Sequence, residues 1–159
     1  MNTSVRHVIA HKGSVVHSVA PDATLTDVVA MLGEKCIGAV VVKDDERVLG
    51  IVTERDCLSE VLWKRRFQPG SRIGDLMRTN LPTVAPRDSI QHCMRVMTEE
   101  RVRHLPVLDE GKLVGLISMG DVIHALLSDQ QHMIESLERY ISGSPSTVPP
   151  PPVGRVQSR

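Results

Sequence analysis

An internal duplication constrains the fold of this 159-residue chain more than any other feature. The run Gly-Ile-Val-Thr-Glu-Arg-Asp at 50–56 returns as Gly-Leu-Ile-Ser-Met-Gly-Asp at 115–121, an offset of 65 positions. The same offset relates the apolar patterns that precede both runs, without a gap. A unit of this length cannot bury a sheet face by itself, so the sequence predicts two copies of one unit that pack against each other.

The predicted order within each unit is β-α-β-β-α, preceded by a short apolar lead-in. The lead-ins lie at 5–10 and 73–77. The first unit is expected to contain a strand at 15–19, a helix from Thr24 or Thr26 to near Gly33, strands at 37–42 and 48–52 around a turn at 43–46, and a helix opened by Asp56. The fold class is therefore α+β, with small sheets flanked by helices.

Three segments follow from this pattern. Residues 1–66 hold the first repeat with its lead-in, and residues 67–142 hold the second repeat with an extended last helix. The tail at 143–159 contains four consecutive prolines at 149–152, which support neither a helix nor a sheet ladder, so we expect it to be disordered.

The last helix continues an apolar stripe beyond the end of the repeat. Its members are Ile123, Leu126, Leu127, Met133, Ile134, Leu137 and Ile141. Since a second helix usually covers such a stripe, we infer a homodimer contact through this segment.

Composition argues against several classes of protein. The net charge is zero and aromatic residues make up 2%, so neither nucleic acid nor an anionic membrane is an obligatory partner. Neither a membrane span nor a signal-peptide pattern is present, which points to the cytoplasm. The three cysteines, Cys36, Cys57 and Cys93, form no Cys-x-x-Cys pair, and the His7 and His11 pair lacks a third ligand, so no metal site is expected. Without a nucleophile elbow or a phosphate-binding loop, we expect no catalysis.

The repeated hydroxyl-x-x-acid junctions, Thr53 to Asp56 and Ser118 to Asp121, allow two interpretations. Such a spacing is a helix capping box, a structural device. It also places backbone N–H groups, a hydroxyl and a carboxylate at a helix N-terminus, which suits a sugar phosphate. Duplication in register favours the ligand interpretation.

These junctions, together with the Thr-Val-Ala-Pro run at 83–86 and the run at 101–107, resemble the cystathionine β-synthase (CBS) domain family. Two tandem copies resemble a CBS pair, or Bateman module, over residues 5–142. The resemblance implies pseudo-twofold symmetry between the repeats, a flat disc of two pairs, and adenine nucleotides in the clefts between repeats.

Carried over residue by residue, the resemblance implies that Asp121 accepts hydrogen bonds from ribose hydroxyls and that Ser118 contacts ribose or phosphate, with Asp56 and Thr53 as their counterparts. The positions implied at the adenine and the phosphate are Thr83, Val102, Arg103 and His104, with Pro106 beside them, and Ser18, Ile37, Gly38 and Ala39 in the first repeat.

The first-repeat positions lack the basic pair of Arg103 and His104, and Val41 replaces Pro106. Arg55 and Lys12 are the candidate compensating charges. We therefore expect unequal affinities, with the cleft of the second repeat the stronger.

The resulting hypothesis is a sensor that binds AMP, ADP, ATP or NAD(H) and signals occupancy to an unidentified protein through a change of shape. One alternative is a dimerisation and docking scaffold with degenerate clefts. Another is redox or metal sensing through the cysteines and histidines.

Overall fold

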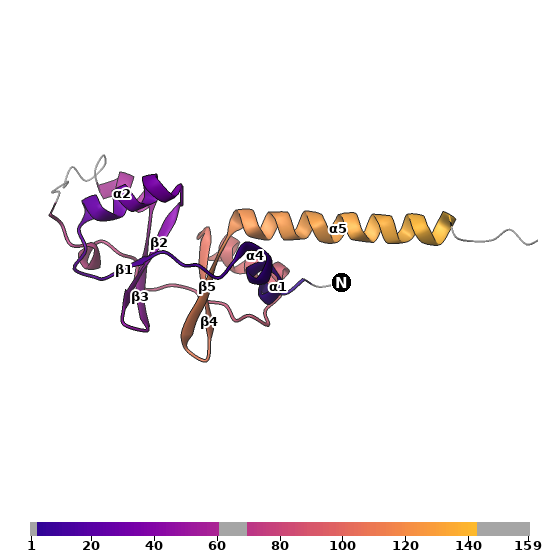
Figure 1. Ribbon diagram of the computed structural model, residues 1–159, viewed down its shortest axis with the longest axis horizontal. Coiled ribbons are helices and arrows are strands. Elements are labelled where there is room, and N and C mark those ends of the chain that lie inside the picture. The colour runs from indigo at the N-terminus through magenta and orange to yellow at the C-terminus, as the bar shows by residue number, and fades with distance from the viewer. Residues whose placement is uncertain (1–2, 61–69, 143–159) are drawn as a thin grey trace, which may run out of the picture.

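The computed structural model describes residues 3–60 and 70–142 (Figure 1). The tail at 143–159, predicted to be disordered, lies outside these ranges. The elements are α1 (Val5–Lys12), β1 (Ser18–Val19), α2 (Leu25–Lys35), β2 (Ala39–Asp44), β3 (Arg47–Thr53), α3 (Glu54–Leu58), the 3-10 turn η2 (Ile73–Asp75), α4 (Ile90–Glu99), β4 (His104–Asp109), β5 (Lys112–Ser118) and α5 (Met119–Ser142). The predicted α+β class with two tandem units is confirmed.

The two sheets follow the duplication closely. In the first, β1 pairs in parallel with β2, and β2 pairs antiparallel with β3. In the second, β4 pairs antiparallel with β5, and an isolated parallel bridge from Val84 to Val107 takes the place of β1. Both hairpins turn through a residue with positive φ, Asp45 in one and Glu110 in the other. Figure 1 shows the sheets beside each other with both hairpin turns on the same side.

Local signals account for most helix ends. Thr24, and not Thr26, caps α2: its hydroxyl accepts from the Asp27 backbone N–H at 3.2 Å, and the Asp27 carboxylate accepts from the Thr24 N–H at 3.0 Å. The helix passes the expected end at Gly33 and closes at Cys36, which has the left-handed φ of 51°. The predicted strand at 15–19 is limited to its last two residues.

The lead-ins are exchanged between the repeats. Val5 and Val8 of α1 are buried in the core of the second repeat, where their neighbours include Ile90 and Leu105. Ile73 of η2 is fully buried in the core of the first repeat. The lead-in at the N-terminus therefore belongs to the first repeat in sequence but packs on the second, while the boundary predicted at 66/67 falls outside the described residues.

Two helices begin at the repeated junctions. Thr53 caps α3, so that helix starts two residues before the expected Asp56. The second junction opens α5, a helix of 24 residues that runs out past the second repeat (Figure 1). Within residues 3–60 and 70–142, no helix is long and apolar enough to cross a membrane.

Candidate functional site

The first junction is a complete capping box with an added cation. The Thr53 hydroxyl accepts from the Asp56 backbone N–H at 3.3 Å, while Asp56 Oδ2 accepts from the Thr53 N–H at 3.1 Å and from its hydroxyl at 2.7 Å. The remaining oxygen, Oδ1, accepts from Arg78 Nε at 2.9 Å. Both oxygens of Asp56 therefore already have donors in this structure.

The second junction has the same geometry but a different cation. Asp121 Oδ2 accepts from the Ser118 N–H and hydroxyl, both at 2.7 Å, and from Lys12 Nζ at 2.5 Å. Burial acts to raise the pKa of Asp121, but the hydrogen bonds from Lys12 and Ser118 outweigh it and hold that pKa below 3.8. Asp121 is thus a carboxylate at neutral pH. Its Oδ1 has no protein donor within the described part of the chain, so it can accept from a ligand.

The cations at both junctions come from the exchanged lead-ins. Lys12 ends α1, which packs on the second repeat, and Arg78 follows η2, which packs on the first. An antiparallel bridge between Ile51 and Arg78 fixes the second of these segments, with N–H to O distances of 3.1 and 3.0 Å. Each acid is therefore paired with a charge delivered by a segment from elsewhere in the chain.

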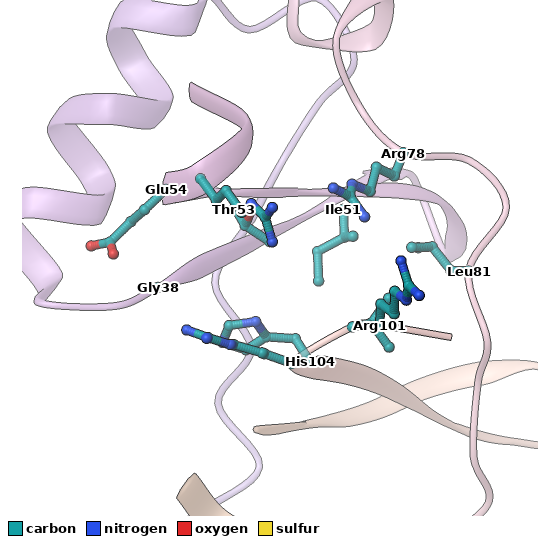
Figure 2. Close-up of a pocket in the computed structure, with 11 residues that line it drawn as sticks. Gly38, Ile51, Thr53, Glu54, Arg78, Leu81, Arg101 and His104 are labelled. Atoms are coloured by element: carbon teal, nitrogen blue, oxygen red, sulfur yellow. The ribbon is translucent and has the colours of Figure 1, made fainter. Parts of the chain in front are cut away.

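A pocket of about 350 Å³ opens between the repeats at the first junction (Figure 2). Its volume lies within the range of small-molecule sites, roughly 300–1,000 Å³. Figure 2 shows Gly38, Ile51 and Thr53 on one side and Arg101 and His104 on the other. The lining residues are Gly38, Ile51, Thr53, Glu54, Arg55, Arg78, Leu81, Arg101, Val102, Arg103 and His104.

The pocket is strongly basic. Its lining includes four arginines against one glutamate, and the Glu54 carboxylate points away from Ile51 and Leu81 in Figure 2. Arginine is suited to phosphate because its planar guanidinium donates two parallel hydrogen bonds. This arrangement can therefore hold a phosphate group beside an apolar wall.

The symmetry-related positions beside the second junction lack this charge. Moved by 65 positions, Arg55, Arg78, Arg101 and Arg103 fall on Gly120, Gly13, Cys36 and Gly38. The junction at Ser118 consequently keeps its hydroxyl and acid but has none of the four cations at the equivalent places. The charge asymmetry between the two junctions is built into the sequence.

His104 lies where the two repeats meet. A Cβ added to Gly38 would lie 3.5 Å from its ring, an ordinary van der Waals distance, so the imidazole packs directly beside the backbone of the first repeat. Burial lowers the pKa of His104, and the positive charges of Lys12 and Arg103 act in the same direction against Asp121 and Glu54. The ring is therefore neutral at pH 7, and its buried Nδ1 has no hydrogen-bond partner within the described residues.

The structure gathers only part of the predicted site. Six predicted residues line the pocket: Gly38, Thr53, Arg55, Val102, Arg103 and His104. Asp56 lies behind Thr53 through the capping box. Lys12, Ser118 and Asp121 form the other junction, so Lys12 compensates the second repeat and not the first. The remaining predicted residues do not line the pocket: Ser18, Ile37, Ala39, Thr83 and Pro106.

The basic pair expected to strengthen the second cleft faces the first junction. His104 begins β4 of the second repeat and Arg103 directly precedes it, yet both line the pocket with Thr53 of the first. Sequence reasoning also missed five lining residues, namely Ile51, Glu54, Arg78, Leu81 and Arg101. The sequence did contain a signal for the two missed arginines. The positions 65 residues before Arg78 and Arg101 hold the uncharged Gly13 and Cys36, so the duplication marks both arginines as departures from the repeat.

The cysteines do not form a reactive cluster in this structure. Burial, with a smaller contribution from nearby acids, raises the pKa of both Cys57 and Cys93 to about 11. Both thiols are therefore protonated at neutral pH and poorly nucleophilic. Among residues 3–60 and 70–142, no three histidine, cysteine or acidic side chains are grouped to hold a metal.

Comparison with known proteins identifies the family. The family model of the CBS domain matches this chain twice, at residues 5–62 and 73–128. The CBS domain-containing protein CBSX3, mitochondrial, of Arabidopsis thaliana is 32% identical over 151 residues, covering 89% of this chain and 73% of that protein. A CBS-domain containing protein from Agrobacterium tumefaciens is 36% identical with a TM-score of 0.74, over 77% of this chain and 98% of that chain.

The crystal structure of CBSX2 in complex with AMP is also similar. It shares 28% identity and a TM-score of 0.62, over 72% of this chain and 90% of that chain. With two matches in tandem over most of its length, this chain belongs to the CBS domain family.

Proposed function

We propose that this protein is a regulatory module that binds an adenosine-containing nucleotide, AMP, ADP, ATP or NAD(H), between its two repeats. The observation that carries the proposal is the pocket whose lining includes four arginines together with Thr53. The complex of the similar CBSX2 with AMP supports the ligand class. No catalytic role is assigned to any residue, and the output is a change of shape passed to another protein.

The pocket suggests how occupancy could change the shape. Its walls come from both repeats, so a ligand that contacts both favours the arrangement of repeats that fits it. Arg78 couples the pocket to the core of the first repeat, because the same residue pairs with Asp56 and bridges Ile51. The size of the shift is set by the difference in affinity between the two arrangements.

The arginines at the first junction reverse the order of affinities expected from the sequence, in which the cleft of the second repeat was the stronger. We propose that the cleft at Thr53, which has the arginines, binds phosphorylated ligands first. The cleft at Ser118 would then take a second nucleotide more weakly, with the free Oδ1 of Asp121 as ribose acceptor. We further propose that the module acts as a homodimer and, as predicted from the sequence, in the cytoplasm.

Calorimetry with AMP, ADP, ATP, NAD, NADH and adenosine tests the ligand. Replacing Arg103 by glutamine removes a charge-assisted contact of about 1.5–3 kcal/mol, so the Kd for ATP should rise at least about tenfold. Arg47→Gln is the matched control, since Arg47 is exposed at the start of β3 and does not line the pocket. Adenosine should be affected little by either change because it lacks phosphate.

Two results would refute the proposal. One is the absence of binding for every compound in the panel, which would favour the docking-scaffold alternative. The other is an equal ATP affinity for Arg103→Gln and Arg47→Gln, which would mean that the arginine pocket does not hold the phosphate.

A further inference from the structure

His104 is a titratable side chain between the two repeats that the phosphate-binding arginines do not explain. It begins β4 of the second repeat and lines the pocket together with Gly38 and Thr53 of the first. Its ring atoms Cε1 and Nε2 each lie 3.5 Å from the position that a Gly38 Cβ would take. The imidazole is therefore part of the pocket wall at the contact between the repeats (Figure 2).

The imidazole departs from the internal duplication. The position 65 residues before His104 is Ala39, which is buried and begins β2. Both residues occupy the same place in their hairpins, because Ala39 pairs with Thr53 and His104 pairs with Ser118. A methyl group is therefore sufficient at this place in the fold, and the backbone does not require the larger titratable ring.

Charged groups from four segments act on the ring. Lys12 ends α1, Arg103 precedes β4, Glu54 begins α3 and Asp121 lies in the first turn of α5. Burial lowers the pKa of His104 most; Lys12 and Arg103 lower it further, while Asp121 and Glu54 raise it. The other charged residues of the pocket wall are Arg55, Arg78 and Arg101. The excess of positive charge on this wall therefore favours the neutral ring.

The ring also has a nitrogen for which the protein supplies no partner. Nδ1 of His104 is buried and has no hydrogen-bond partner among residues 3–60 and 70–142. An unpaired buried polar atom is an exception in folded proteins and calls for a specific explanation. Since an imidazolium has two N–H groups and a neutral imidazole one, the charged ring needs acceptors that this wall does not provide.

A phosphorylated ligand would reverse both conditions. Its phosphate oxygens carry negative charge and accept hydrogen bonds, so they offset the arginines and supply acceptors for an imidazolium. An opposite charge within about 4–6 Å moves a pKa by about 1–3 in favour of the charged form. The arginines stay protonated throughout, whereas a histidine changes its charge near neutral pH. His104 can therefore respond to the charge of a ligand by gaining a proton.

We propose that a phosphorylated ligand enters this pocket together with a proton from the solvent, which His104 takes up. The inference rests on the proposed function, because it needs a phosphate beside the arginines, and it adds proton linkage to that function. Coupling between two ligands is reciprocal, so a phosphorylated nucleotide binds more tightly as the pH falls. His104 thus distinguishes phosphorylated ligands from adenosine by their charge.

Calorimetry in two buffers of different ionisation enthalpy measures the number of protons taken up. At pH 6.5, ATP should bind the parent with an uptake about 0.3 proton or more above that of His104→Gln, whose side chain does not titrate. Ionisation of ATP itself contributes equally to both proteins, so the difference isolates the ring. His124→Gln should behave like the parent, because His124 is exposed on α5 and does not line the pocket. Adenosine should give the same proton uptake with all three proteins.

The pH dependence of affinity is a second measurement of the same step. Between pH 8 and pH 6, the Kd for ATP should fall at least about threefold more in the parent than in His104→Gln. His104→Ala should behave like His104→Gln, and the alanine at the duplicated position indicates that the fold accepts it. Circular dichroism verifies that both variants are folded.

The outcomes separate this inference from the proposed function. Equal proton uptake by the parent and His104→Gln, with ATP bound to both, would overturn the proton linkage and leave nucleotide binding in place. A parent that binds no ATP would overturn both. The NMR signal of the His104 ring, assigned by its loss in His104→Gln, gives a direct check. Its titration midpoint should move to higher pH with saturating ATP, and an unmoved midpoint would also overturn the linkage.

Discussion

Gly50 lies where the exchanged lead-in of the second repeat crosses β3, and adding one methyl group there should destabilise the protein. A Cβ at this position would be 2.6 Å from the Arg78 carbonyl oxygen and 2.7 Å from Met77 Sδ. Non-bonded carbon contacts are favourable at about 3.5–4.0 Å. The backbone oxygen cannot rotate away, so either β3 or the segment at Arg78 must move.

Two routes of relaxation give similar costs for Gly50→Ala. If the segment moves, the two hydrogen bonds between Ile51 and Arg78 are lost, at about 0.5–1.5 kcal/mol each. If it stays, the overpacked contact costs about 1–3 kcal/mol. We therefore expect a loss of about 2 kcal/mol, and a Tm lower by about 4–8 °C for a chain of this size.

The symmetric glycine supplies a matched control. At Gly115 the added Cβ would meet the end of the Ile9 side chain, with Cδ1 at 2.7 Å and Cγ1 at 3.1 Å. That side chain is only partly buried and can change rotamer, at about 0.5–1.5 kcal/mol. Gly115→Ala should therefore cost about 1 kcal/mol, half the loss expected for Gly50→Ala.

Urea denaturation followed by circular dichroism measures both variants against the parent. The reasoning fails if Gly115→Ala destabilises as much as Gly50→Ala, or if Gly50→Ala lies within about 0.5 kcal/mol of the parent. Either result would mean that the lead-in at Arg78 does not approach β3 as closely as the structure shows.

Three further predictions concern the junctions and the buried ring. Thr53→Ala should cost about 1 kcal/mol in urea denaturation, because the Asp56 N–H loses its capping oxygen; no change would contradict the cap. Asp121, with its pKa held below 3.8, adds stability that is present above the unfolded-state pKa and is lost as the pH falls through the folded-state value. Lys12→Met should therefore flatten the Tm profile below about pH 4, and an unchanged profile would contradict the pairing. The pKa of His104 is lowered from 6.5, so the neutral ring adds stability that is lost as the pH falls below 6.5. His104→Gln should therefore flatten the profile of Tm against pH below 6.5. A profile as steep as that of the parent would contradict the burial of a neutral ring.

Sequence reasoning was most accurate where interactions are local. The first and last residues of β4 lie 65 positions after those of β2, and the same is true of β5 and β3. Capping at Thr24 and the two hydroxyl-x-x-acid junctions also follow from spacing alone, because these hydrogen bonds join residues three apart.

Sequence reasoning failed where a segment crosses from one repeat to the other. The position of a lead-in in the chain gave no information about which core its apolar residues enter, and Ile73 has the same burial as an ordinary core residue of the first repeat. The pairing of Lys12 with Asp121, 109 positions apart, depends on that exchange. The same reason explains why Arg78 was missed in the pocket.

The exchange also links the pocket to stability. Neither repeat has a complete core from its own consecutive residues, since each uses a lead-in that precedes the other. The segment at Arg78 completes the first core, pairs with Asp56 and lines the pocket. A phosphate that draws the Arg78 side chain into the pocket must compete with the carboxylate of Asp56 for the same guanidinium. The proposed binding of a phosphorylated ligand and the packing of the lead-in would therefore share one residue, Arg78, which would give a physical route from occupancy to a change between the repeats.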